Sequence, residues 1–161
     1  MKVLNNKKLL RIIVAFVLLN FYCNIVSAQN YGEDIKIRTM LHSFYTTYIS
    51  AGCEDLSTNY EPKLNRIKKR YCTAKFVKNL TSRTETGEID WDPLINAQDF
   101  NPKWILSLSI KRNVSRINQY DISYFDDYTH KESTMKVTVT KQGEDFLINN
   151  VLLYDSKWLF N

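Results

Sequence analysis

The spacing of apolar side chains changes along this chain, from three and four residues in its first half to two in its second. Between residues 34 and 80, apolar side chains recur at the spacing that lines one face of a helix. From residue 106 onward, large apolar residues alternate with polar ones, as in strands with one buried face. A polar, turn-rich stretch, residues 88–102, separates the two patterns. The change predicts an α+β domain with helices on one face of an antiparallel sheet.

Two long helices are expected before the polar stretch. The first covers residues 34–51, and Gly52 is a natural stop. Glu61-Pro62 can open the second, because proline suits the first helical position, and its apolar face extends to Leu80. The predicted buried positions are Ile37, Met40, Leu41, Phe44, Tyr45, Tyr48 and Ile49 in the first helix, and Leu64, Ile67, Tyr71, Ala74, Phe76, Val77 and Leu80 in the second.

A third, short helix and four strands complete the expected fold. Asp92 before Pro93 is a suitable N-cap for a helix from Leu94 to Phe100. The strands have short connections, which implies antiparallel pairing between neighbours in the sequence. The predicted strands cover residues 104–110, 120–124, 135–141 and 146–154.

The first 28 residues have the pattern of a secretory signal peptide. Four basic residues and no acid precede or flank a short apolar run at residues 12–19, and Val26-Ser27-Ala28 offers small residues for cleavage before Gln29. The run is too short for a membrane span of about 20 residues. We therefore expect a periplasmic or secreted protein with no stable membrane span after cleavage; an uncleaved anchor is the alternative.

Removal of the signal leaves residues 29–161, a single domain of 133 residues with 18 basic and 17 acidic side chains. This near-neutral balance gives no reason to expect nucleic acid as a partner. The second predicted helix is nonetheless basic, from Lys63 to Lys78. We interpret this as a solvated face, with an anionic lipid or protein partner as the alternative.

Two cysteines, Cys53 and Cys72, remain in the mature chain. In an oxidising compartment an even pair is best interpreted as one disulfide, which would connect the end of the first helix to the middle of the second. Two free buried thiols are the alternative. Catalytic cysteine chemistry is disfavoured, because neither His42 nor His130 lies in a recognisable nucleophile motif.

The carboxylates of residues 88–102 have two interpretations. Asp90, Asp92 and Asp99 could hold a cation or polar ligand, but the segment lacks the glycine turn and downstream acid of the looped calcium motif. The capping role of Asp92 before Pro93 favours a structural interpretation. We therefore predict no metal, no cofactor and no catalytic residue.

In this order of elements, the chain resembles the nuclear-transport-factor-two-like superfamily of cone-shaped, cystatin-like α+β domains, and within it an uncharacterised family of secreted bacterial domains. The residues that carry the resemblance are Phe44–Tyr48, Tyr60–Leu64, Asp90–Asp99 and Phe146–Val151. The resemblance implies a curved four-stranded sheet around a pocket with a helix across its mouth. It implies no reaction, because one fold serves many functions.

Three functions remain open. The favoured one is an exported, non-enzymatic module that binds an unidentified small ligand or protein. The others are an inhibitor or immunity-type protein against a secreted enzyme or toxin, and a small isomerase- or hydratase-like enzyme with a pocket carboxylate. For an enzyme of this superfamily, the resemblance implies Tyr45, Tyr48, Asp121 and Tyr124 as candidates. Asp121 lies on the opposite face from Ile122 and would be exposed if Ile122 packs inward. The candidate ligand-binding residues are Tyr45, Trp91, Gln98 and Asp99.

Overall fold

The computed structural model describes residue 14, residues 31–54 and residues 61–153. The predicted signal peptide apart from residue 14, the link at residues 55–60 and the last residue of the final predicted strand lie outside this range. The chain divides into two compact units, Met1–Lys36 and Ile37–Asn161. Residues 31–36 of the first unit are helical. No helix among the described residues is long and apolar enough to cross a membrane.

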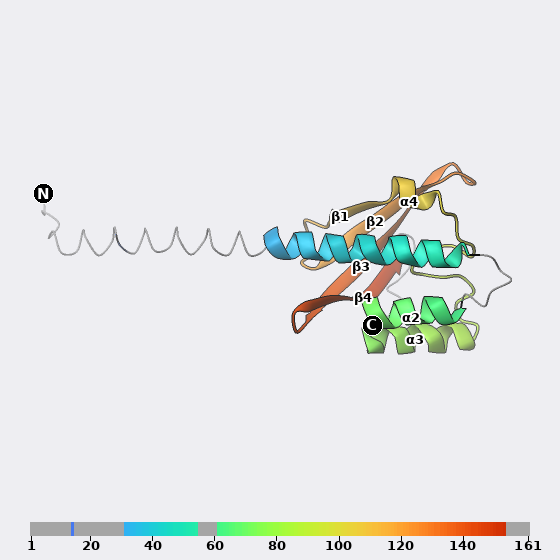
Figure 1. Cartoon of the computed structure of the whole chain (residues 1–161), viewed down its shortest axis with the longest axis horizontal. Coiled ribbons are helices and arrows are strands. Elements are labelled where there is room, and N and C mark those ends of the chain that lie inside the picture. The colour runs from blue at the N-terminus through green and yellow to red at the C-terminus, as the bar shows by residue number, and fades with distance from the viewer. Residues whose placement is uncertain (1–13, 15–30, 55–60, 154–161) are drawn as a thin grey trace, which may run out of the picture. The chain divides into compact units, whose positions relative to one another are not determined.

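The second unit begins with a helix over residues 37–52. Two further helices follow, α2 (Glu61–Tyr71) and α3 (Ala74–Glu85), which lie side by side (Figure 1). A fourth helix, α4, is a single turn at Trp104–Ser107. The first predicted helix is confirmed, because its apolar face is the buried one.

Four strands form one antiparallel sheet in the order in which they occur along the chain, which confirms the predicted meander. The strands are β1 (Ser109–Arg112), β2 (Gln119–Asp126), β3 (Lys131–Gln142) and β4 (Asp145–Leu153). Gly143 lies in the turn between β3 and β4 with a φ of 62°, in the left-handed region that glycine adopts at little cost. Short turns of this kind explain why each strand pairs with its neighbour.

The second predicted helix is in fact two helices, and the break at Cys72-Thr73 has a clear cause. The backbone N–H of Thr73 donates to the carbonyl oxygen of Ile148 in β4 at 2.8 Å. The Thr73 hydroxyl then accepts from the backbone N–H of Phe76 at 3.3 Å and caps α3. The helix is therefore interrupted at Cys72 and Thr73, where the backbone bonds to the sheet. Both α2 and α3 contact β4.

The helix predicted from Leu94 to Phe100 does not form, so that prediction is wrong. The strand predicted to begin at Trp104 begins later in the chain. Residues 93–96 form turns, closed by backbone hydrogen bonds between Asp92 and Ala97 of 2.9 and 3.3 Å. Asn96 has a φ of 50°, a left-handed conformation that a right-handed helix cannot contain. The helical turn instead lies at α4, and β1 begins only at Ser109.

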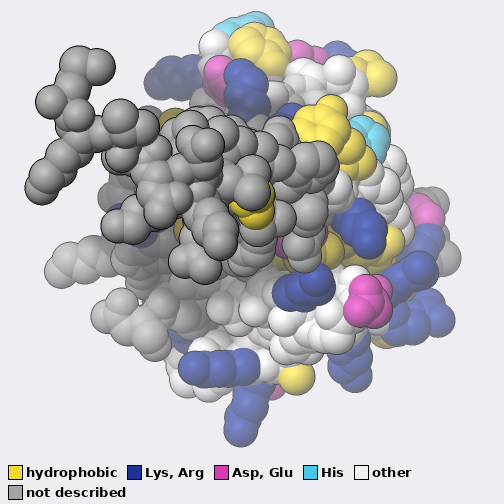
Figure 2. Space-filling model, turned by 90° about the vertical axis from the view of Figure 1, so that its left-hand side faces the viewer, with side chains coloured by type: hydrophobic (Ala, Val, Ile, Leu, Met, Phe, Trp, Pro, Cys, Tyr) yellow, Lys and Arg dark blue, Asp and Glu magenta, His cyan; other side chains and the backbone are white. Residues whose placement is uncertain are grey.

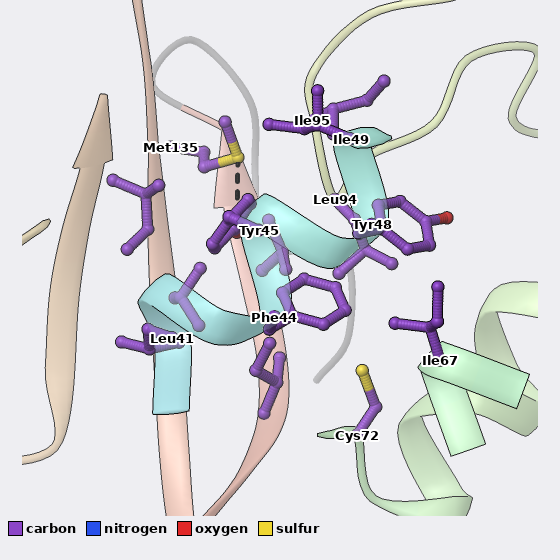
Figure 3. Close-up of a cluster of buried hydrophobic side chains, with 14 of the residues drawn as sticks. Leu41, Phe44, Tyr45, Tyr48, Ile49, Ile67, Cys72, Leu94, Ile95 and Met135 are labelled. Carbon is purple, nitrogen blue, oxygen red and sulfur yellow. Dashed lines mark hydrogen bonds between the residues drawn. The ribbon is translucent and has the colours of Figure 1, made fainter. Parts of the chain in front are cut away.

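The core fills the space between the helix over residues 37–52 and the inward face of the sheet (Figure 3). The Tyr45 hydroxyl donates to the Met135 sulfur at 3.6 Å, and the rings of Phe44 and Tyr48 stack with centroids 5.1 Å apart. The resemblance implied a pocket in this place, whereas side chains occupy it. The fully buried residues of the core include Leu41, Phe44, Tyr45, Tyr48, Ile49, Ile122, Met135, Val137, Ile148 and Val151.

Cys53 and Cys72 are free thiols in this structure. Cys72 is buried in the hydrophobic core, and its backbone forms a bridge to Ile148 of β4. Cys53 is half-buried at the end of the first helix. The disulfide expected from the sequence is therefore not formed in this structure.

Candidate functional site

A small pocket lies where the polar stretch at residues 88–102 meets α2 and α3. Its volume is about 230 Å³. The first helix, α2, α3 and the polar stretch each contribute to its wall, so it depends on the tertiary packing of four segments. Its lining residues are Tyr48, Glu61, Leu64, Lys68, Leu80, Thr84, Ile89, Asp90, Trp91, Asp92, Pro93, Gln98 and Phe100.

A hydrogen bond between Tyr48 and Asp92 closes the inner side of this pocket. The Tyr48 hydroxyl donates to Oδ2 of Asp92 at 2.6 Å, and Figure 3 shows this hydroxyl pointing away from the core cluster. The other carboxylate oxygen of Asp92 accepts from the backbone N–H of Leu94 at 2.9 Å. Asp92 therefore accepts a hydrogen bond from the backbone two residues later, as a capping residue would, but it begins a turn and not a helix.

Burial raises the pKa of the Asp92 carboxyl, and the hydrogen bonds from Tyr48 and from the Leu94 N–H oppose that rise. Burial and the adjacent Asp92 carboxylate raise the pKa of Tyr48 well above its ordinary value. Both oxygens of Asp92 are engaged by protein groups, which makes this residue part of the pocket's framework rather than a free acid.

The structure brings together two of the four predicted ligand-binding residues. Trp91 and Gln98 both line the pocket. Asp99 is exposed and does not line it, and Tyr45 is fully buried in the core. Within the described part of the chain, Trp91 Nε1 is buried and has no hydrogen-bond partner. No group of three or more His, Cys, Asp or Glu side chains among the described residues could hold a metal ion.

The second candidate surface is the outer face of the sheet, opposite the core. Side chains alternate between the two faces, so Tyr120, Ile122 and Tyr124 of β2 point inward and the residues between them point outward. A recess of about 990 Å³ includes part of this face and extends to the hairpin between β2 and β3. The outer-face residues that line it are Lys111, Asp121, Ser123, Thr134 and Lys136.

Asp121 lies at the centre of this outer face. It is paired in register with Lys111 of β1 on one side and Lys136 of β3 on the other. Ile122 packs inward, as the sequence suggested, yet Asp121 is half-buried rather than exposed. Among the described residues, its Oδ1 oxygen is buried without a hydrogen-bond donor. A buried acceptor of this kind is costly unless another molecule supplies a donor.

At the hairpin end of the recess, α4 is fixed to β2. The indole of Trp104 stacks on Tyr124 with ring centroids 4.3 Å apart, and its N–H donates to Asp126 at 3.4 Å. The backbone N–H of Phe125 donates to the Ser107 hydroxyl at 3.0 Å. These contacts hold the hairpin base in place and leave its apolar side chains facing outward.

Three large apolar side chains are exposed in this region. Leu106 of α4 is 88% exposed, Tyr128 in the hairpin turn 91% and Phe125 of β2 45%. Sequence reasoning missed them, although Phe125 falls on the outward-facing positions of β2, two residues beyond Ser123. Aromatic side chains exposed beside a polar recess are typical of protein interfaces.

A third feature is the basic surface of α2. This helix carries five Lys or Arg residues and one acid, Glu61. Figure 2 shows Lys and Arg side chains at the top, right and bottom of the face that it draws. Lys63 is paired with Glu54, and the remaining basic residues are spread along the helix.

Comparison with known proteins supports the fold. A protein of unknown function from Bacteroides thetaiotaomicron is similar with a TM-score of 0.66 and 20% identity, over 81% of this chain and 98% of that one. A chain from the type VI effector–immunity complex Tae3–Tai3 of Ralstonia pickettii is similar with a TM-score of 0.57 and 15% identity, over 74% and 97%. No protein-family model and no curated protein sequence matches the chain.

Proposed function

We propose that this protein is an exported, non-enzymatic module that binds another protein through the outer face of its sheet, and that it acts as an immunity-type inhibitor of a secreted effector. The observation that carries the proposal is the group of exposed apolar residues Leu106, Phe125 and Tyr128 beside the polar recess of the outer face. An apolar rim beside a polar recess is a surface that a partner protein would cover.

The chemistry of this face favours a protein over a small ligand. Its recess of about 990 Å³ is broad and lined mainly by charged and hydroxyl side chains, whereas small-molecule sites are mostly apolar and enclose their ligand. Tyr and Phe beside a polar centre instead match the few residues that dominate binding energy in protein interfaces. The likeness to a chain of an effector–immunity complex supports the same class of function.

The predicted signal peptide adds the location. A protein exported to the periplasm would meet effectors that enter or pass through that compartment. On the outer face, a partner that presents carboxylates would meet Lys111, which lies in register with Asp121. Such paired charges confer specificity in addition to affinity.

A protection assay tests this proposal. The full chain, with its first 28 residues, is produced in a laboratory bacterium together with each member of a panel of type VI effectors directed to the periplasm. We expect growth to be restored against at least one effector, and that effector to co-purify with residues 29–161. If no effector is neutralised and none forms a complex, the immunity function is wrong.

A further inference from the structure

The two edges of the sheet differ in what covers them. At one edge, the backbone N–H of Thr73 donates to the carbonyl oxygen of Ile148 in β4 at 2.8 Å, and Cys72 forms a bridge to the same residue. At the other edge, β1 pairs only with β2 among the described residues (Figure 1). An uncovered edge strand offers a row of backbone donors and acceptors to another chain.

The register identifies the backbone groups of β1 that face this open edge. The N–H of Asn113 donates to the carbonyl oxygen of Gln119 at 2.8 Å, and from there the positions bonded to β2 alternate along β1. Lys111 is therefore bonded to β2, whereas the N–H and C=O groups of Ile110 and Arg112 point away from it. Outside the sheet, neither of these two residues forms a backbone hydrogen bond to another described residue.

A groove of about 410 Å³ lies beside this edge, between β1 and the helix over residues 37–52. Leu108 and Ile110 form its apolar side, and both are half-buried against the core. Ile110 is on the inner face of the sheet, because it pairs with the inward-facing Ile122. The helix contributes Arg38, Thr39, His42 and Ser43 to the groove. A strand added beside β1 would place every second side chain here.

The charges around the groove select the class of partner. Among the described residues, no Asp or Glu lines the groove, whereas Arg38 does. Arg112 is exposed and is the next inner-face residue of β1 after Ile110, and Lys111 is exposed on the outer face. A second copy would bring the same basic groups to the edge, and charged edge strands are a device that prevents such pairing. An acidic segment brings the complementary charge.

We propose that the open edge of β1 binds an extended acidic segment of a partner protein as an added strand. The backbone of the segment bonds to Ile110 and Arg112, its apolar side chains pack on Leu108 and Ile110, and its carboxylates meet Arg112 and Lys111. In strand addition, main-chain hydrogen bonds give affinity and pockets for alternate side chains give specificity. The inference does not rest on the proposed immunity function, because it concerns the edge of the sheet and not its outer face.

NMR titration of isotope-labelled residues 29–161 with a peptide library tests the proposal. The peptides have about eight residues, and in them aspartate or glutamate alternates with valine, isoleucine or phenylalanine. We expect at least one peptide to bind saturably and to shift the amide signals of Ile110 and Arg112. Replacing its acids by lysine should weaken binding at least roughly tenfold. Absence of binding by every peptide, or equal binding of the lysine form, would overturn the proposal.

Methylation of the peptide's backbone nitrogens tests whether it binds as a strand. Alternate nitrogens of a strand face opposite sides, so only one of the two alternate sets can donate to β1. Methylating that set should weaken binding at least roughly tenfold more than methylating the other. Equal effects of the two sets would show that the peptide is not an added strand.

Two substitutions place the peptide at this edge. Thr39→Trp fills the groove from an exposed position of the helix and should weaken binding more than roughly tenfold; Thr47→Trp, exposed on the same helix outside the groove, is the matched control. Arg112→Glu should weaken binding of the acidic peptide and strengthen binding of the lysine form, whereas Arg66→Glu on α2 should change neither. Unchanged affinity in both edge variants would overturn the site, and either variant decides the question if the other does not fold. Signals of Ile110 and Arg112 that shift with protein concentration, without peptide, would instead assign the edge to a second copy.

Discussion

The Tyr48 hydroxyl donates a hydrogen bond of 2.6 Å to Oδ2 of Asp92, a residue 44 positions later in the chain. This contact connects the helix over residues 37–52 to the turn after Asp92, which forms part of the wall of the small pocket. Asp92 also accepts from the Leu94 N–H, so one carboxylate holds together the helix and the polar stretch at residues 88–102. The position of that stretch therefore depends on a side chain far away in sequence.

Tyr48→Phe should lower the free energy of unfolding by about 1–3 kcal/mol, because it leaves a buried carboxylate oxygen without its donor. Urea denaturation at neutral pH measures this change. Tyr45→Phe is the control: its hydroxyl donates to the weakly accepting sulfur of Met135, and the expected loss is below about 1 kcal/mol. Equal losses in the two variants would contradict a special role for the Tyr48–Asp92 contact.

The same variant has a defined pH dependence. Burial raises the pKa of Asp92 in the folded state, so its ionisation destabilises the fold as pH rises through that pKa. Loss of the Tyr48 hydrogen bond removes a group that lowers this pKa and should raise it further. The stability difference between wild type and Tyr48→Phe should therefore be largest at neutral pH. It should shrink as pH falls through the raised folded-state pKa of Asp92, which lies above the ordinary aspartate value of about 3.9. Unfolding curves measured between about pH 3 and pH 7 follow this change.

Gly52 should not tolerate alanine. A Cβ atom at this position would overlap the ring of Phe100, which itself lies edge-on to Tyr48 with centroids 5.6 Å apart. We expect Gly52→Ala to destabilise the protein by about 1–3 kcal/mol through overpacking. Gly32→Ala, at a helical glycine with open space around it, is the matched control and should not destabilise. A double variant with Phe100→Ala should recover part of the loss at residue 52, and strict additivity would contradict the clash.

Thr73 should matter more than other hydroxyl residues near it. It caps α3 at the point where the chain bonds to β4, and its hydroxyl also lies 3.3 Å from Oδ1 of Asn149. Thr73→Ala should cost about 1 kcal/mol of unfolding free energy, as for other N-cap residues. Ser82→Ala, exposed within α3, should change stability by less than about 0.5 kcal/mol. A reversed order of the two values would show that the cap does not stabilise the junction.

The cysteines give a test of the redox state. Burial raises the pKa of the Cys72 thiol to about 12, so it should react with a thiol reagent far more slowly than the half-buried Cys53. Both thiols should titrate once residues 29–161 are unfolded in guanidinium without a reductant. If neither titrates, the disulfide predicted from the sequence forms in the purified protein.

Sequence patterns predicted the sheet better than the segments between its elements. Alternation from Met135 to Lys141 identified the centre of β3, because a strand with one buried face must alternate. The first residues of β3, from Lys131, carry no such alternation of apolar groups, and pairing with β2 alone extends the strand there. The beginning of β3 could therefore not be predicted from periodicity.

The errors lie where tertiary contacts override local preference. Asp92 before Pro93 has the sequence of a helix start, but its backbone pairs with Ala97 and the left-handed Asn96 ends any helix. Likewise, the apolar period continues through Cys72, and only the bond from Thr73 to β4 divides the helix. Neither partner is near in sequence, so local signals could not reveal them.

The candidate sites were predictable in part. The polar stretch pointed to Trp91 and Gln98, which do share a pocket, because side chains without a capping role were the ones left to bind a ligand. Lys68 joins them only through the packing of α2 against that stretch. The outer face around Asp121 depends on the register of three strands, which the sequence does not give.

The most direct test of the central claim is the affinity of residues 29–161 for the effector that they neutralise, measured with substitutions at each end of β2. Phe125→Ser with Tyr128→Ser alters the apolar rim at the hairpin end. Val114→Ser with Ile117→Ser alters other exposed apolar residues, in the loop before β2. The proposed interface predicts a loss of more than roughly tenfold for the first pair and little change for the second. Unchanged affinity in the Phe125/Tyr128 variant would contradict binding through this face.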